Sequence, residues 1–143
     1  MEYTFVIDNS VVMSWCFADE SNQYADDVLE SLKYTRAIVP CIWPLEVGNV
    51  LVVAERRGRL KYADGIRFWE LLGELPIDIE QNLSEEIIRN IYTLAREAHL
   101  STYDASYLEL ALRRNLSLAT LDKALLRASK KFNVPIFNKP WGI

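Results

Sequence analysis

Four acidic residues, Asp8, Glu46, Asp104 and Asp122, have the residue type and the surroundings for metal chemistry. Asp8 and Asp122 each follow a predicted strand, whereas Glu46 and Asp104 lie near the starts of predicted helices. Parallel α/β sheets place their sites at the carboxyl ends of the strands. If all four side chains meet there, their mutual repulsion favours a bound divalent cation such as Mg²⁺ or Mn²⁺.

Each of these acids also has a simpler, structural interpretation. Asp8 and Asp122 are residue types that favour turns and helix caps. Glu46 is an acid in the first turn of a helix, which the helix dipole favours. Ser101 and Asp104 resemble a capping box. No single acid therefore identifies a site, and the prediction depends on all four converging.

The helix that carries Glu46 is predicted to be buried. It begins at Pro44 and contains an unbroken apolar run from Val50 to Ala54, so it is apolar nearly all round. Asn49 lies on the same face as Glu46. A buried carboxylate must be paired or must coordinate something, and Glu46 is therefore a candidate metal ligand.

Asp104 is predicted to point towards the core. It shares a helical stripe with Tyr107 and Leu108, whereas Glu109 and Arg113 form an i, i+4 pair on the predicted solvent face. At about 100° per residue, Arg113 lies opposite Asp104. The acid is thus expected on the inward side of its helix.

Strand and helix signals alternate along the chain, which predicts the α/β class with a central parallel sheet of four to five strands. No linker or repeat divides residues 1–143, so we expect one domain. The predicted strands cover residues 3–7, 37–39, 77–79, 116–120 and 134–137. The predicted helices cover residues 11–17, 23–32, 44–57, 62–72, 84–98, 103–114 and 123–131.

Composition narrows the possible chemistry. The net charge of −4 argues against a protein that coats nucleic acid through a broad positive field. A single histidine, His99, disfavours a histidine-based triad, and with two separated cysteines, Cys16 and Cys41, it disfavours structural zinc. No secretory signal is apparent and no apolar run reaches the ~18–20 residues that span a bilayer. We therefore expect a cytoplasmic protein with buried thiols.

Taken in order, the acids and their neighbours resemble the motifs of the PIN-domain family, and within it the VapC toxins of prokaryotic toxin–antitoxin pairs. The likeness extends over nearly the whole chain. The matching segments are Asp8-Asn9-Ser10, Glu46 with Asn49, Tyr103-Asp104-Ala105 and Thr120-Leu121-Asp122.

This resemblance implies a three-layer α/β/α fold and an endoribonuclease that depends on Mg²⁺ or Mn²⁺. It also implies a small cognate antitoxin and a homodimer. We expect Asp8 and Asp104 to hold the principal cation, Glu46 to share or orient it and Asp122 to help hold a second, with water attacking the phosphodiester in line. Ser10, Asn49 and Thr120 are expected to fix the carboxylates by hydrogen bonds.

Two further groups of residues bear on partners. A basic cluster follows the predicted buried helix, and it is either a solvated surface or a set of phosphate contacts; its members are Arg56, Arg57, Arg59 and Lys61. Four aromatic residues are expected mostly in the core, with some in an apolar patch for a second copy or an antitoxin helix. They are Trp15, Phe17, Phe68 and Trp69.

Two alternatives remain open at this point. The first is Mg²⁺-dependent phosphoryl transfer through an aspartyl phosphate, but Ser10 occupies the position where haloacid-dehalogenase-like phosphatases have a second acid. A receiver domain would need a phosphorylatable aspartate after a middle strand, where only Asp78 is available, within the strand. The second alternative is a non-catalytic binding module of PIN-like fold.

Overall fold

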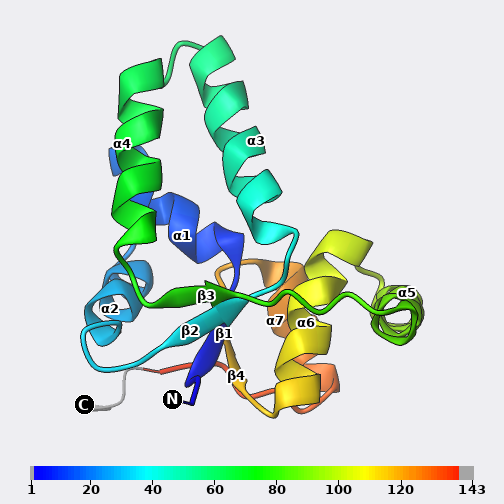
Figure 1. The fold of residues 1–143 in the computed structure, drawn as a ribbon. Helices are drawn as coiled ribbons and strands as arrows, with labels where there is room; N and C mark the ends of the chain where they lie inside the picture. Colours follow the sequence, from blue (N-terminus) through cyan, green and yellow to red (C-terminus); the bar gives the residue numbers. More distant parts are fainter. Residues whose placement is uncertain (1, 139–143) are drawn as a thin grey trace.

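The structure is a computed structural model that describes residues 2–138. Within this range, seven α-helices and a short 3₁₀ turn surround a four-stranded sheet (Figure 1). The strands are β1 (Phe5–Ile7), β2 (Ala37–Val39), β3 (Ile77–Ile79) and β4 (Ser117–Ala119). The helices are α1 (Asn9–Cys16), α2 (Gln23–Ser31), α3 (Trp43–Arg56), α4 (Tyr62–Gly73), α5 (Glu85–Ala98), α6 (Thr102–Arg114) and α7 (Lys123–Lys131), and the 3₁₀ turn is η1 (Ala18–Glu20).

All strand pairs in the sheet are parallel, in the order β3-β2-β1-β4. Val6 of β1 is opposite Ile38 on one side and Leu118 on the other. Every residue of β1 and β2 is buried, as expected for parallel strands covered on both faces. The strand order reverses at β1, so the crevice between the ends of β1 and β4 is the switch point where such sheets place their sites.

The strand predicted at residues 134–137 is reduced to one bridge between Leu118 and Ile136. Two hydrogen bonds hold it, from Leu118 N to Pro135 O and from Phe137 N to Leu118 O, both 2.9 Å long. Pro135 has no N–H to extend the ladder. The segment is instead anchored by its side chains, since the Phe137 ring stacks on Phe5 at a centroid distance of 3.9 Å.

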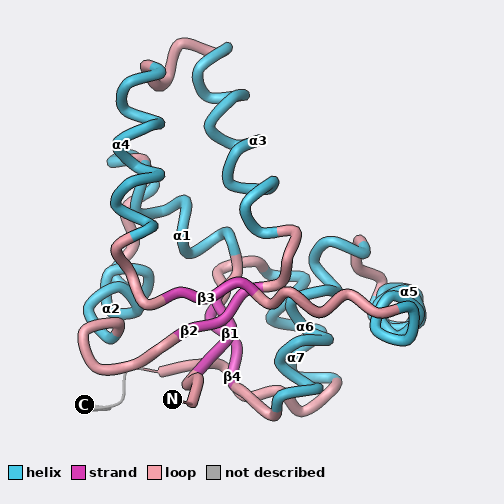
Figure 2. The backbone as a smooth tube through the Cα atoms, in the orientation of Figure 1, coloured by secondary structure: helices cyan, strands magenta, loops and turns pink. Residues whose placement is uncertain are grey.

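Helices cover both faces of the sheet, which gives the three-layer α/β/α arrangement expected from the sequence. Helix α6 packs on β1 and contacts α5 and α7, whereas α1 contacts α2 and α3. Figure 2 shows α3 and α4 rising away from the sheet as a helical hairpin. No helix within residues 2–138 is long and apolar enough to cross a membrane.

The prediction that α3 is buried all round is wrong. Leu45 is 71% exposed and Val52 is 42% exposed, although both are apolar. One stripe of the helix is buried, and it comprises Trp43, Val47, Leu51 and Ala54. The helix is therefore one-sided, because it leaves the sheet to form the hairpin with α4. The two thiols are also less buried than expected, as Cys16 and Cys41 are free and partly exposed.

Candidate active site

Asp8 lies at the carboxyl end of β1, where the chain turns into α1. Its side chain is buried, and its Oδ2 accepts hydrogen bonds from Ser10 Oγ (2.6 Å) and Thr120 Oγ1 (2.8 Å). Burial raises the pKa of Asp8, and the two hydroxyl donors oppose that shift by stabilising the charged form. The Asp8 carboxylate is thus fixed in place by a hydroxyl in the first turn of α1 and a hydroxyl just after β4.

The turns after β1 and β4 are joined by the same hydroxyls. Ser10 Oγ accepts a hydrogen bond from Leu121 N at 2.9 Å, and Thr120 Oγ1 accepts one from Asp122 N at 3.0 Å. Asp122 in turn caps α7, because its Oδ1 accepts from Leu125 N at 2.9 Å. Two residues predicted to fix the carboxylates, Ser10 and Thr120, therefore contact Asp8 directly. Asp122 occupies the predicted cap position beside them.

Glu46 lies in the first turn of α3 and is half-buried. The Tyr107 hydroxyl, from α6, donates a hydrogen bond to Glu46 Oε1 at 2.5 Å. Burial raises the pKa of Glu46, and the negative charges of Asp8 and Asp104 raise it further against the effect of the tyrosine bond. Glu46 therefore lies within electrostatic reach of two of the other predicted ligands.

Asp104 lies in the first turn of α6, and its backbone N–H is capped by Ser101 Oγ at 3.1 Å. The capping prediction is thus confirmed for the backbone, while the carboxylate remains half-buried. Burial, then the charge of Asp8 and then that of Asp122 raise the pKa of Asp104. Tyr107 and Leu108 on the same stripe are fully buried, so this side of α6 faces the core.

Electrostatic coupling links the acids pairwise: Glu46 is coupled to Asp8 and Asp104, and Asp104 is coupled to Asp8 and Asp122. Within residues 2–138, however, no group of three or more Asp, Glu, His or Cys side chains is arranged so that it could hold a metal ion. The donors nevertheless fit a hard divalent cation, since they are carboxylate oxygens. Burial and neighbouring acids raise the pKa values of Glu46 and Asp104. Mg²⁺ keeps several of its waters and needs only one or two direct carboxylates in many sites.

Other predicted site residues make no recorded hydrogen bond to these acids within the described part of the chain. Asn49 is exposed, and among the described residues no hydrogen bond links it to a carboxylate. Arg59 pairs with Asp19 and Glu20, each at 3.1 Å. Arg56 and Arg57 are exposed at the far end of α3, roughly 15 Å along the helix axis from Glu46 at 1.5 Å per residue.

The four aromatic residues divide between the core and its margin. Phe17 and Phe68 are buried, whereas Trp15 and Trp69 are partly exposed and pack against the core. The Trp15 indole N–H donates to Ala25 O at 2.8 Å. Most exposed large apolar side chains lie in two regions. One is the α3–α4 hairpin, with Leu45, Val52, Tyr62, Ile66 and Leu71, and the other comprises α5, α6 and the segment before α5, with Leu83, Ile88, Tyr92, Tyr103 and Leu112.

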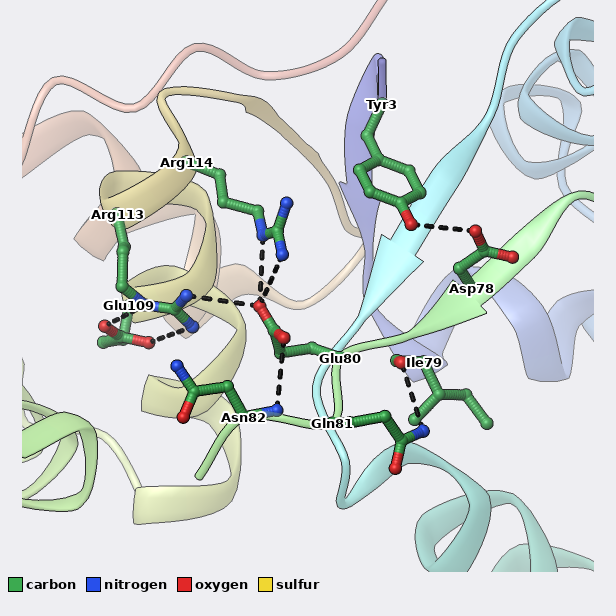
Figure 3. Close-up of polar contacts among 9 residues, drawn as sticks. All are labelled: Tyr3, Asp78, Ile79, Glu80, Gln81, Asn82, Glu109, Arg113 and Arg114. Carbon is green, nitrogen blue, oxygen red and sulfur yellow. Dashed lines mark hydrogen bonds and ion pairs between the residues drawn. The ribbon is translucent and has the colours of Figure 1, made fainter. Parts of the chain in front are cut away.

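A second charged cluster, of which the sequence predicted only the Glu109–Arg113 pair, ties the end of β3 to the end of α6 (Figure 3). Glu80 accepts hydrogen bonds from Arg114 (2.9 Å), Arg113 (3.2 Å) and Asn82 N (3.2 Å). Burial acts to raise the pKa of Glu80, but these donors outweigh it and the pKa lies below its usual range. We call Glu80, Glu109, Arg113 and Arg114 the paired cluster.

The prediction that Glu109 lies on a solvent-exposed face of α6 is wrong. It is only 6% exposed, although it does form the predicted pair with Arg113 at 2.9 Å. The face is covered because the segment after β3, which carries Glu80, lies against the end of α6 (Figure 3). In the sequence, the adjacent arginines Arg113 and Arg114 at the end of one helix were the available sign of this cluster. Their partner Glu80 could not be identified, because it is more than 30 residues away in sequence.

Comparisons with solved structures show that the fold is shared with other proteins. A structure titled PAE2754 from Pyrobaculum aerophilum matches with a TM-score of 0.69 and 23% identity, covering 88% of this chain and 84% of that one. FitAcB from Neisseria gonorrhoeae matches with a TM-score of 0.64 and 18% identity over 98% of this chain and 100% of that one. A toxin–antitoxin complex from Klebsiella pneumoniae matches with a TM-score of 0.58 and 21% identity over 83% and 87%.

At these sequence identities, the structural similarity is evidence for a shared fold alone. A search of curated proteins gives no match. The sequence itself matches the family model of the PIN domain over residues 5–131, which includes all four acids. The chain belongs to the PIN-domain family.

Proposed function

We propose that this protein is a divalent-cation-dependent endoribonuclease in which Asp8, Glu46, Asp104 and Asp122 hold Mg²⁺ or Mn²⁺. The observation that carries the proposal is the electrostatic coupling of these acids at the β1–β4 switch point. Three of them have raised pKa values, and none of the three forms an ion pair with a basic residue among those described. PIN domains are typically nucleases, and a cation at this place would compensate the charge.

The residues of the chain have distinct parts in the proposed reaction. Ser10 and Thr120 hold Asp8 through its Oδ2, and the capping bond at Leu125 N fixes Asp122. The acids exclude the phosphodiester from their centre unless positive charge is present. When bound, divalent cations neutralise the phosphate and lower the pKa of a coordinated water.

We also propose that the protein is the toxin of a toxin–antitoxin pair and acts in the cytoplasm as a homodimer. The sequence motifs resemble those of VapC toxins, and the fold resembles that of a toxin–antitoxin complex from Klebsiella pneumoniae. The exposed apolar side chains of the α3–α4 hairpin offer a surface for an antitoxin helix; they are Leu45, Val52, Tyr62, Ile66 and Leu71. Co-purification with the product of a neighbouring reading frame checks this part.

The nuclease proposal is tested with purified protein, a mixed set of structured and single-stranded RNAs, and Mg²⁺ or a chelator. We expect cleavage with Mg²⁺ and none with the chelator. Asp104→Asn should lower the rate roughly 10³-fold, because a cation contributes several kcal/mol to the transition state. Glu55→Gln is the matched control, since Glu55 is an exposed acid on α3.

The outcomes separate the nuclease from the binding module. Cleavage by wild type and Glu55→Gln, but not by Asp104→Asn, supports the proposal. An Asp104→Asn protein that cleaves as fast as wild type contradicts it. A wild-type protein that binds Mn²⁺ and RNA without cutting any RNA would favour the non-catalytic module.

A further inference from the structure

Tyr107 joins two of the elements that carry the predicted ligands. Its side chain is fully buried in α6, one turn after Asp104, and its hydroxyl donates to Glu46 Oε1 of α3 at 2.5 Å. Residues three apart on a helix lie on the same face. One turn of α6 therefore supplies both an acid of the site and a hydrogen bond to a second acid.

We propose that Tyr107 is a positioning residue whose hydroxyl holds the Glu46 carboxylate beside Asp8 and Asp104 and leaves Oε2 of Glu46 for a cation. The inference rests on the proposed function, because it concerns the same site. Among the described residues, the Tyr107 hydroxyl is the donor that the structure records for Glu46, and it contacts Oε1.

A glutamate at this place needs such a support. Its side chain has several rotatable bonds, and ordering them costs entropy. The charges of Asp8 and Asp104 act on Glu46 as well and favour conformations that move its carboxylate away. A tyrosine with a buried ring is rigid, and a hydrogen bond to a carboxylate is stronger than one to a neutral acceptor.

A simpler role for Tyr107 would be to pack its ring and satisfy its hydroxyl. Tyr24 shows what that arrangement looks like in this chain, because its hydroxyl donates to the backbone carbonyl of Phe137 at 2.8 Å. Tyr107 instead donates to a carboxylate that two other acids repel. An ionised carboxylate can only accept hydrogen bonds, so the Tyr107 hydroxyl is the donor of this bond.

The test measures Mn²⁺ affinity by isothermal titration calorimetry in wild type, Tyr107→Phe and the matched control Tyr24→Phe. Each variant loses one hydroxyl and one hydrogen bond. We expect Tyr107→Phe to bind Mn²⁺ about 10-fold or more weakly, in the range found when a partner of a metal ligand is removed. Tyr24→Phe should bind as wild type does, and the melting temperatures of the two variants without metal should fall by similar amounts.

A double-mutant cycle tests whether Tyr107 acts through Glu46. In a Glu46→Ala background, Tyr107→Phe should change the Mn²⁺ affinity by less than about 2-fold, because there is no carboxylate left to hold. An equal loss in both backgrounds would show a packing role and overturn the inference.

The two proposals fail in different ways. If wild type binds Mn²⁺ and Tyr107→Phe binds it equally well, the positioning role is refuted while the proposed function stands. If wild type binds no Mn²⁺ at any concentration, both the proposed function and this inference are overturned.

Discussion

Two groups of acids in this molecule have opposite electrostatic environments. In the paired cluster, Glu80 and Glu109 are bonded to Arg113 and Arg114, and the pKa of Glu80 is lowered. In the candidate site, Asp8 and Glu46 accept hydrogen bonds from hydroxyl groups, and their pKa values are raised. The first group is neutralised by the arginines of the chain, whereas among the described residues no basic side chain forms an ion pair with Asp8 or Glu46.

The comparison suggests how the fold assigns roles to its carboxylates. The paired cluster joins the end of β3 to the end of α6 and has no charge left to balance, so it suits a structural role. The site lies between β1 and β4 and stores repulsion among fixed side chains. Unpaired acids that repel one another do not stabilise the fold, so their presence here favours a binding role.

The largest stability effect should come from adding a cation to the site. At a Mg²⁺ concentration 100 times its Kd, the free energy of unfolding should rise by about 2.7 kcal/mol. Asp8→Asn should lose most of this gain while its stability without metal is unchanged or higher, because one repelling charge is removed. Chemical denaturation with and without Mg²⁺ measures both values, and an equal gain in the variant would show that Mg²⁺ binds elsewhere.

A smaller effect is expected from breaking the paired cluster. Glu80→Gln weakens the bonds from Arg113 and Arg114 and should lower the free energy of unfolding by about 1–2 kcal/mol. We expect no larger loss in free energy of unfolding, because both arginines are partly exposed and solvent screens their charges. Metal affinity and the cleavage rate of the folded variant should stay as in wild type, so a large loss of either would show that the two regions are coupled.

The smallest expected effect is on the pH dependence of stability without metal. Where a carboxyl has a raised pKa, the folded state keeps a proton that the unfolded state has already released. The contribution of Asp8, Glu46 and Asp104 therefore falls as pH rises from the usual carboxyl range towards their raised pKa values. Glu80 has a lowered pKa, so its contribution to the free energy of unfolding changes in the opposite sense and is lost as the pH falls into the acid range.

This pH effect is measured by comparing the free energy of unfolding at about pH 5 and pH 7 in wild type and Asp104→Asn. Because Asp104 is half-buried, the change in free energy of unfolding between these two pH values should differ between the two proteins by only a fraction of a kcal/mol. Wild type should lose more stability than the variant as pH rises, and saturating Mg²⁺ should remove the difference. Identical slopes without metal would contradict the predicted coupling of Asp104 to the other acids.

Local patterns in the sequence predicted the fold well. Alternating strand and helix signals predicted the four parallel strands and seven helices found within residues 2–138, with boundaries that differ by a few residues. They also placed Asp8 after the first strand, and Asp104 on the buried stripe of α6. These features depend on periodicity, capping and strand ends, which nearby residues determine.

The errors arose where tertiary contacts decide burial. The apolar run on α3 predicted a buried helix, but the hairpin with α4 leaves Leu45 and Val52 exposed. Glu109 was placed on a solvent face that the segment after β3 covers. The bond between Tyr107 and Glu46 links residues 61 positions apart, and no local pattern specifies such a contact.

The central claim is that a divalent cation supplies the charge that the site lacks. Crystals grown with Mn²⁺ and measured by anomalous diffraction test it most directly. The account predicts an anomalous peak in contact with the carboxylates of Asp8 and Asp104, which is absent in Asp104→Asn crystals. A peak elsewhere with an empty site, or acids neutralised by basic side chains of the protein, would contradict it.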